Sequence, residues 1–158
     1  MRMLVCADES KHSDKTIQEA VNIAEGLSAG EVILLHAYQL ESSQMDLNVF
    51  YEGVSSNEVR KQMEDLEKVG GQEELKEQIS SRRDFLARAA KSFEDKGIPV
   101  KLMLREGEPG EVICDAAAKE QVDMVVMGGR GRSGGGYSLG SVSSTVSQKC
   151  QSTTIIVK

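Results

Sequence analysis

The clearest structural signal lies near the C-terminus, where residues 123–157 read DMVVMGGRGRSGGGYSLGSVSSTVSQKCQSTTIIV. This stretch begins and ends with a short apolar segment. Between them, a glycine-rich segment leads into apolar residues at four-residue steps. Short apolar runs are typical of buried strands, and a four-residue spacing is typical of one face of a helix. The pattern therefore predicts a strand, a glycine-rich loop, a helix and a strand. The residues that set the helical spacing are Val142, Val146 and Cys150.

The rest of the chain repeats this alternation. It predicts a single doubly wound α/β domain over residues 1–158, with a five-stranded parallel sheet and helices on both faces. Ser13 is expected to cap the first helix, and residues 39–71 form an insertion with a helical pattern near Asn57. The expected strands are Arg2–Ala7, Glu31–Tyr38, Val100–Leu104, Asp123–Met127 and Ile155–Val157. The expected helices begin near Ser13, Gln72, Pro109 and Ser141.

Composition and charge narrow the class of protein. The chain has 19 Lys and Arg against 25 Asp and Glu, a formal net charge of −6. A nucleic-acid or anionic-membrane binder needs the opposite sign, so neither partner is expected. Cys6, Cys114 and Cys150 form no C-x-x-C pair, which favours a reducing, cytoplasmic location. With 2 histidines in the chain, a multi-histidine metal site is excluded. His36 lies inside an apolar strand and is interpreted as a packed core residue.

Two polar features follow the ends of expected strands. Asp8 follows the first strand, and the glycine-rich segment from Gly128 to Ser141 follows the fourth. Ligands of open α/β sheets bind outside the carboxyl ends of the strands, where the strand order reverses. Asp8 therefore faces the loop if these two strands are neighbours. Glycines let the backbone approach a ligand, and a helix start at Gly140 offers free N–H groups to a phosphate. The alternative is a flexible surface loop that binds no ligand.

Six segments carry a family resemblance: Leu4–Ser10, Leu34–Ala37, Gly107–Pro109, Asp123–Gly128, Gly140–Val142 and Ile155–Val157. Together they resemble the nucleotide-binding branch of the universal stress protein family, over nearly the whole chain except residues 39–71. The resemblance implies an adenine nucleotide alpha hydrolase-like, Rossmann-like fold. The loop is one residue shorter than the pattern of this branch, since eight residues separate Gly131 from Gly140. Glycine-rich backbone can absorb such a deletion, so the pocket is expected to be kept.

The resemblance also implies a ligand, which is ATP or AMP with Mg²⁺. Asp8 and the backbone of Ala37 are then expected at the adenine and ribose. The residues expected beside the ribose and the phosphates are Met127, Gly128 and Gly131. Those expected to cradle the phosphate chain are Gly140, Ser141 and Val142, with Ser133 near the outer phosphates.

The leading hypothesis is a regulatory protein that binds ATP or AMP and hydrolyses ATP slowly or not at all. A kinase or fast ATPase needs a base, metal-binding carboxylates and a cationic clamp, whereas Asp8 is the only carboxylate placed for such a role. One alternative is a family member that binds no nucleotide and acts as a structural or signalling dimer. A second alternative is an enzyme that uses ATP for adenylyl transfer.

A homodimer is expected through the final strand, residues 153–158. In the strand order that the family implies, Thr153–Lys158 lies at an edge of the sheet. It contains no proline, and Lys158 is its only charge. Prolines and charged side chains protect edge strands from pairing with other chains, so an apolar edge that largely lacks them favours pairing with a second copy of the chain. The family resemblance implies the same assembly.

Overall fold

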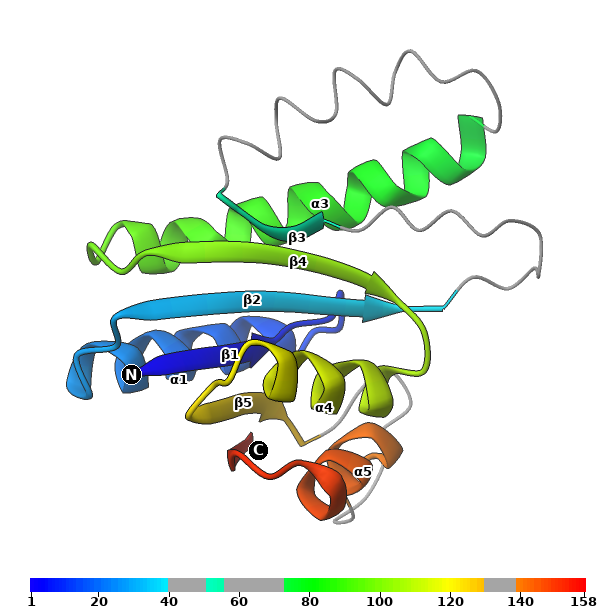
Figure 1. The fold of residues 1–158 in the computed structure, drawn as a ribbon. Helices are drawn as coiled ribbons and strands as arrows, with labels where there is room; N and C mark the ends of the chain where they lie inside the picture. The colour runs from blue at the N-terminus through cyan, green and yellow to red at the C-terminus, as the bar shows by residue number, and fades with distance from the viewer. Residues whose placement is uncertain (40–50, 56–72, 130–138) are drawn as a thin grey trace.

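The computed structural model describes residues 1–39, 51–55, 73–129 and 139–158, in which strands and helices largely alternate (Figure 1). The helical pattern near Asn57 lies outside these residues. The strands are β1 (Arg2–Cys6), β2 (Glu31–Tyr38), β3 (Tyr51–Ser55), β4 (Val100–Glu106), β5 (Met124–Gly128) and β6 (Thr153–Val157). The helices are α1 (Ser13–Gly26), α3 (Glu73–Glu94), α4 (Pro109–Lys119) and α5 (Ser141–Lys149).

The strands form one sheet in the order β3-β4-β2-β1-β5-β6. Strands β1, β2, β4, β5 and β6 pair in parallel, which confirms the expected five-stranded parallel sheet. The short strand β3 pairs antiparallel with β4 and was not expected from the sequence. It lies within residues 39–71, so this insertion adds a strand to one edge of the sheet. The strand order reverses between β1 and β5, which are neighbours.

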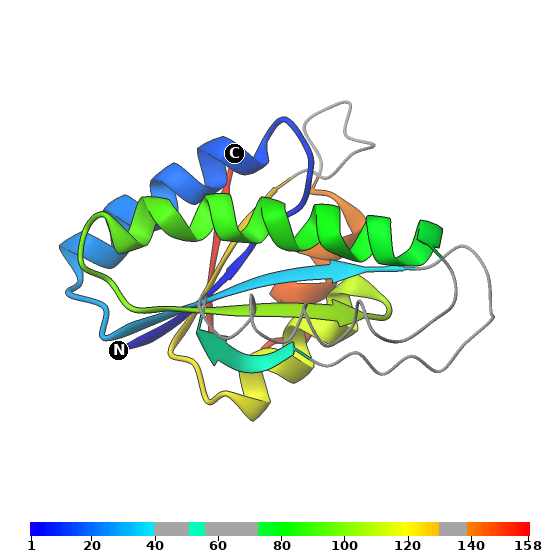
Figure 2. The same cartoon turned by 90° about the horizontal axis from the view of Figure 1, so that it is seen from above.

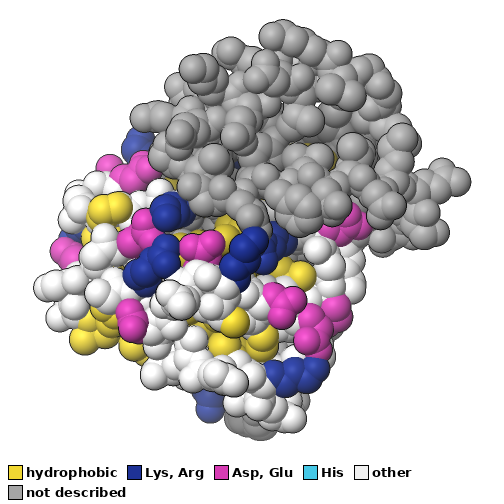
Figure 3. Space-filling view, in the orientation of Figure 1, with side chains coloured by type: hydrophobic (Ala, Val, Ile, Leu, Met, Phe, Trp, Pro, Cys, Tyr) yellow, Lys and Arg dark blue, Asp and Glu magenta, His cyan; other side chains and the backbone are white. Residues whose placement is uncertain are grey.

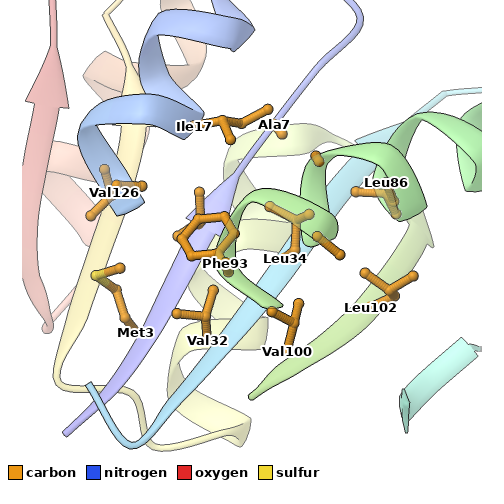
Figure 4. Packing of buried hydrophobic residues seen from close by; sticks show 14 of the residues in the cluster. Met3, Ala7, Ile17, Val32, Leu34, Leu86, Phe93, Val100, Leu102 and Val126 are labelled. Carbon is orange, nitrogen blue, oxygen red and sulfur yellow. The ribbon is translucent and has the colours of Figure 1, made fainter. Parts of the chain in front are cut away.

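Helices cover both faces of the sheet, with α1 and α3 on one face and α4 and α5 on the other (Figures 1 and 2). Successive residues of a strand point to opposite faces. Accordingly, Met3 and Val5 pack in the layer of α1 and α3, whereas Leu4 between them packs in the layer of α4 and α5. Figure 4 shows Phe93 of α3 in the first layer, with Val32 of β2 nearby. The unbroken apolar runs in the sequence follow from this burial on both faces.

Ser13 does not cap α1, contrary to expectation. His12 is the N-cap residue and makes no side-chain capping hydrogen bond. Ser13 is the first residue of the helix, and its Oγ accepts a hydrogen bond of 3.2 Å from the backbone N–H of Asp8. The serine therefore holds the turn that carries Asp8 after β1.

Charged groups at the amino ends of the strands are paired with one another. Arg2 Nη2 lies 2.7 Å from Glu31 Oε2 and 3.1 Å from Glu120 Oε2. The backbone N–H of Arg2 donates to Asp123 Oδ2 over 2.7 Å. This cluster joins β1 to its neighbours at the end of the sheet opposite Asp8. On the face shown in Figure 3, basic and acidic side chains are interspersed. None of the described helices is long and apolar enough to cross a membrane.

Candidate functional site

A cleft of about 600 Å³ lies at the carboxyl ends of β1, β2 and β5. Its position follows from the topology. The chain leaves β1 toward β2 on one side of the sheet and returns to β5 on the other, so the connections after β1 and β5 diverge. Such a switch point leaves a crevice in which open α/β sheets bind their ligands. Asp8 and Gly128 both line this cleft, as expected if the two strands are neighbours.

Asp8 forms part of one wall of the cleft and is held by local hydrogen bonds. Its Oδ1 accepts a hydrogen bond of 3.0 Å from the backbone N–H of Ser10. Its own N–H donates to Ser13 Oγ, and the preceding N–H of Ala7 donates to the Leu35 carbonyl over 3.0 Å. An Asp side chain that accepts from the backbone two residues later forms a stable turn. The Asp8 carboxylate therefore lines the cleft on a backbone that is fixed on both sides.

The N-terminus of α5 forms the opposite wall. Gly140 is its N-cap residue, with φ −65° and ψ 162°, and provides no side-chain capping bond. The Gly140 N–H donates to the Gly129 carbonyl over 2.9 Å, while Ser143 Oγ donates to the carbonyls of Gly129 and Gly140 over 3.1 and 3.0 Å. These bonds tie the start of α5 to the end of β5. The first N–H groups of a helix have no partner within the helix and attract anions. Ser141 and Val142, in the first turn, line the cleft.

The structure brings most of the predicted site residues to this cleft. The predicted residues that line it are Asp8, Ala37, Met127, Gly128, Gly140, Ser141 and Val142. Gly131 and Ser133 lie outside the described residues, so their predicted roles beside the phosphates remain predictions. Ser10 also lines the cleft, and its buried Oγ has no hydrogen-bond partner within the described part of the chain.

His36 is buried, as expected, but it also lines the cleft. Its Nδ1 lies 2.9 Å from the Ala7 carbonyl oxygen. Because a carbonyl oxygen only accepts, Nδ1 must carry the proton. Burial lowers the pKa of His36 below its usual range, against the opposing effects of the Ala7 carbonyl and of Glu9. The imidazole is therefore neutral at pH 7, with its proton on the nitrogen that faces Ala7.

Two further cleft residues, Tyr38 and Arg82, were missed by the sequence analysis. Tyr38 ends β2, and Arg82 lies on α3 with its guanidinium carbon 4.9 Å from the centroid of the Tyr38 ring. Arg82 is the only Lys or Arg among the described residues that line the cleft. The charged residues of this helix are typical of a solvated surface. The sequence contains no local signal that separates Arg82 from its neighbours.

The cysteines near the site are packing residues. Cys6 ends β1 and lines the cleft, and burial raises the pKa of its thiol. Burial likewise raises the pKa of Cys114 on α4 to about 11. Thiols with raised pKa are protonated at neutral pH and are poor nucleophiles. In the described ranges, no group of three or more His, Cys, Asp or Glu side chains could hold a metal ion.

Comparison with known proteins assigns the chain to a family. The model of the universal stress protein family matches residues 1–158. The universal stress protein MJ0577 of Methanocaldococcus jannaschii is 32% identical over 135 residues, covering 84% of this chain and 79% of that protein. Universal stress protein Sll1388 of Synechocystis sp. is 26% identical over 161 residues, covering 99% of this chain and 97% of that protein.

Solved structures show the same fold. The structure of MJ0577 has a TM-score of 0.71 at 26% identity and covers 99% of this chain and 94% of its own. The universal stress protein from Archaeoglobus fulgidus, solved in complex with dAMP, has a TM-score of 0.60 at 17% identity, covering 100% of this chain and 98% of its own. At that identity the likeness concerns the fold alone. By the match of the family model along its full length and by its relatives, this chain belongs to the universal stress protein family.

Proposed function

We propose that this protein binds an adenine nucleotide, ATP or AMP, in the cleft at the switch point, and that binding serves regulation rather than turnover. The observation that carries the proposal is the pairing of two features across one cleft. The N-terminus of α5 presents uncapped N–H groups, and the Asp8 carboxylate lies on the other wall. The first suits phosphates, and the second suits hydroxyl or amine donors of a nucleoside.

Proteins of the same fold support this ligand class. A universal stress protein solved in complex with cAMP has a TM-score of 0.60 at 22% identity. The Archaeoglobus fulgidus protein was solved with dAMP. Both ligands combine an adenine base with a single phosphate, the combination that the two walls of this cleft suit. For the nucleotide of this chain, the expected roles are Asp8 and Ala37 at the base and ribose, and Gly140, Ser141 and Val142 at the phosphates.

The described lining favours binding over catalysis. Fast phosphoryl transfer needs metal-binding carboxylates and a cationic clamp on the phosphates. The described lining contains two carboxylates, Asp8 and Glu9, and both follow β1, whereas the phosphate site proposed here lies at α5. Mg²⁺ would therefore bind with ATP through the phosphate oxygens, and it would reduce the charge that α5 must accommodate.

Calorimetric titration of the purified protein with AMP, and with ATP in the presence of Mg²⁺, tests the proposal. Asp8→Asn keeps the oxygen that accepts from Ser10 but removes the charge, and it is expected to weaken binding about tenfold, since a hydrogen bond to a charged group contributes about 1.5–3 kcal/mol. Asp115→Asn, on the exposed side of α4, is the matched control and leaves affinity unchanged.

The outcomes of this titration separate the candidate functions. Absence of heat and of a thermal shift at millimolar nucleotide would refute nucleotide binding and favour the structural or signalling alternative. Sustained release of pyrophosphate in the presence of an acceptor would favour adenylyl transfer. Binding that is lost equally in Asp8→Asn and Asp115→Asn would place the nucleotide elsewhere.

We also propose that the protein forms a homodimer through β6. This strand lies at an edge of the sheet, and its apolar residues Ile155, Ile156 and Val157 are only partly buried. Two such strands related by a two-fold axis would pair antiparallel and satisfy each other's N–H and C=O groups. Sedimentation should show a dimer for the unmodified protein and for Gln151→Lys, but a monomer for Ile156→Lys. A monomer at high micromolar concentration in the unmodified protein contradicts the proposal.

The cysteines support a cytoplasmic location. Cys6, Cys114 and Cys150 are all free thiols in the structure. Free thiols persist in reducing compartments and are oxidised or paired in secreted proteins. Fractionation of the native host, followed by detection of the protein in the soluble cytoplasmic fraction or outside it, tests this location.

A further inference from the structure

Four side chains from two elements form an ordered array at the β2 side of the cleft. His36 and Tyr38 are two residues apart on β2 and therefore point to the same face of the sheet. Arg82 and Phe85 are three residues apart on α3 and are neighbours on that helix. The Phe85 ring meets the His36 ring edge-on, with centroids 5.9 Å apart and an interplanar angle of 66°. The Arg82 guanidinium lies over the Tyr38 ring at 4.9 Å.

Arg82 carries the positive charge of this array. His36 is held neutral by burial, as its lowered pKa indicates. The guanidinium is fixed from two directions, by the Tyr38 ring and by the bond of 3.1 Å from its Nη1 to the Gln78 carbonyl on the preceding turn of α3. Arg82 is half-buried and lines the cleft together with Tyr38. A guanidinium is planar, so with one face on the Tyr38 ring its other face can stack on a second π-system.

The array lies apart from the N-terminus of α5. Across the sheet, β1 separates β2 from β5, and neighbouring strands are about 4.8 Å apart. Moreover, α3 and α5 cover opposite faces of the sheet (Figure 2). A nucleotide with its phosphate at α5 that extends past Asp8 would therefore reach Tyr38 and Arg82 with the end opposite its phosphate, which is the nucleobase.

We infer that Arg82, held on the Tyr38 ring, stacks on the nucleobase and gives the cleft a preference for purines over pyrimidines. This inference rests on the nucleotide binding proposed above and assigns it a specificity determinant. Stacking on Arg planes and aromatic rings is a general means of holding a base and uses the π-face of the base rather than its edges. A purine offers the larger face and gains more from the contact.

Affinities for AMP and CMP, measured by calorimetry or ligand-observed NMR, test the inference. The two ligands share ribose and phosphate, so the ratio of their affinities isolates the base. Arg82→Lys keeps the charge but loses the plane, and it is expected to lower the affinity for AMP about tenfold while affecting CMP less. Arg83→Lys is the matched control: Arg83 pairs with Asp84 over 3.0 Å, does not line the cleft and should leave both affinities unchanged.

Each outcome decides the question. A lower ratio of AMP to CMP affinity in Arg82→Lys, with an unchanged melting temperature, supports the inference. An equal loss for both ligands would show that Arg82 acts on the ribose or the phosphate that they share, and it would overturn the inference. An unchanged affinity for AMP would overturn it as well. If the unmodified protein binds neither nucleotide, the proposed function fails, and the inference fails with it. If it binds AMP with no preference over CMP, the inference alone fails.

Discussion

Adding one methyl group at Gly110 tests how closely α4 and α5 must approach to shape the cleft. A Cβ atom at this position would lie 2.7 Å from Thr145 Cγ2 and 2.9 Å from Thr145 Cβ. Carbon atoms in good contact are about 3.5–4.0 Å apart, so the two helices would have to separate. The Lys149–Glu111 ion pair, which also joins these helices, would resist the separation. Gly110→Ala therefore strains the contact that positions the N-terminus of α5.

The expected loss of stability follows from two opposing effects. Overpacking a well-packed contact costs about 1–3 kcal/mol. Replacing glycine by alanine in a helix returns about 0.5–1 kcal/mol through chain entropy. The net loss in the free energy of unfolding is then at most about 2.5 kcal/mol, with a central value of about 1 kcal/mol. For a domain of this size each kcal/mol lowers Tm by about 2–4 °C, so the central loss should make Gly110→Ala melt about 2–4 °C below the unmodified protein.

Thermal unfolding followed by circular dichroism measures this difference, and Gly26→Ala is the matched control. Gly26 ends α1, and no heavy atom lies within 4 Å of a Cβ built there. The same substitution without the clash should raise Tm, because only the gain of about 0.5–1 kcal/mol remains. Thr145→Ser removes Cγ2, the nearer of the two atoms in the clash. Gly110→Ala should therefore cost less stability when it is introduced into Thr145→Ser than when it is introduced into the unmodified protein.

A limiting contact between α4 and α5 is refuted if Gly110→Ala melts at or above the temperature of the unmodified protein. It is also refuted if Gly26→Ala and Gly110→Ala shift Tm equally, because the effect would then come from chain entropy and not from the contact. A double variant that recovers nothing would show that Thr145 is not the group that limits the approach of the helices.

The remaining predictions concern the cleft and its cysteine neighbour. His36→Asn keeps a donor for the Ala7 carbonyl but cannot titrate. The folded-state pKa of His36 lies below its ordinary value of 6.5, so the unfolded chain takes up the proton first as the pH falls. The free energy of unfolding should therefore decrease at pH values below 6.5 in the unmodified protein, and decrease less in His36→Asn. Urea unfolding between pH 7 and pH 5 measures this difference. The backbone conformation of Gly140 is one that valine also adopts, so Gly140→Val should change Tm little. Its side chain would occupy the proposed phosphate position and should lower the affinity for ATP about tenfold or more. An unchanged affinity would show that the phosphate binds elsewhere. Cys114, with its pKa raised to about 11, should resist iodoacetamide at pH 8 until the protein is unfolded, and rapid alkylation of the folded protein would contradict the raised pKa.

The parallel sheet could be predicted because its physical cause is written locally in the sequence. Strands covered on both faces need apolar residues at consecutive positions, and runs such as Val32–Leu35 satisfy this within a few residues. Strand β3 has no such run, because it lies at the edge and is defined by its antiparallel pairing with β4. Edge strands of this kind depend on a partner far along the chain, which periodicity does not reveal.

Ser13 illustrates the same limit on a smaller scale. A serine before an amphipathic stretch favours an N-cap role, since serine is among the residues preferred there. In the structure its hydroxyl accepts instead from the Asp8 N–H, and His12 occupies the cap position. The choice between these two uses depends on how the chain turns after β1, which propensity alone does not determine.

One side of the cleft could be predicted from the sequence and the other could not, and this difference matters for the proposed nucleotide specificity. The α5 side is encoded by adjacent glycines and a helix start, a local solution to phosphate binding that many proteins share. The side formed by Tyr38 and Arg82 exists only because α3 crosses β2 at that point. A glycine motif indicates that a cleft suits phosphates, whereas in the proposed complex the base would be selected by the residues on β2 and α3. Under that proposal, substitutions on α3 change the preferred nucleotide of this protein and leave its glycine motif intact.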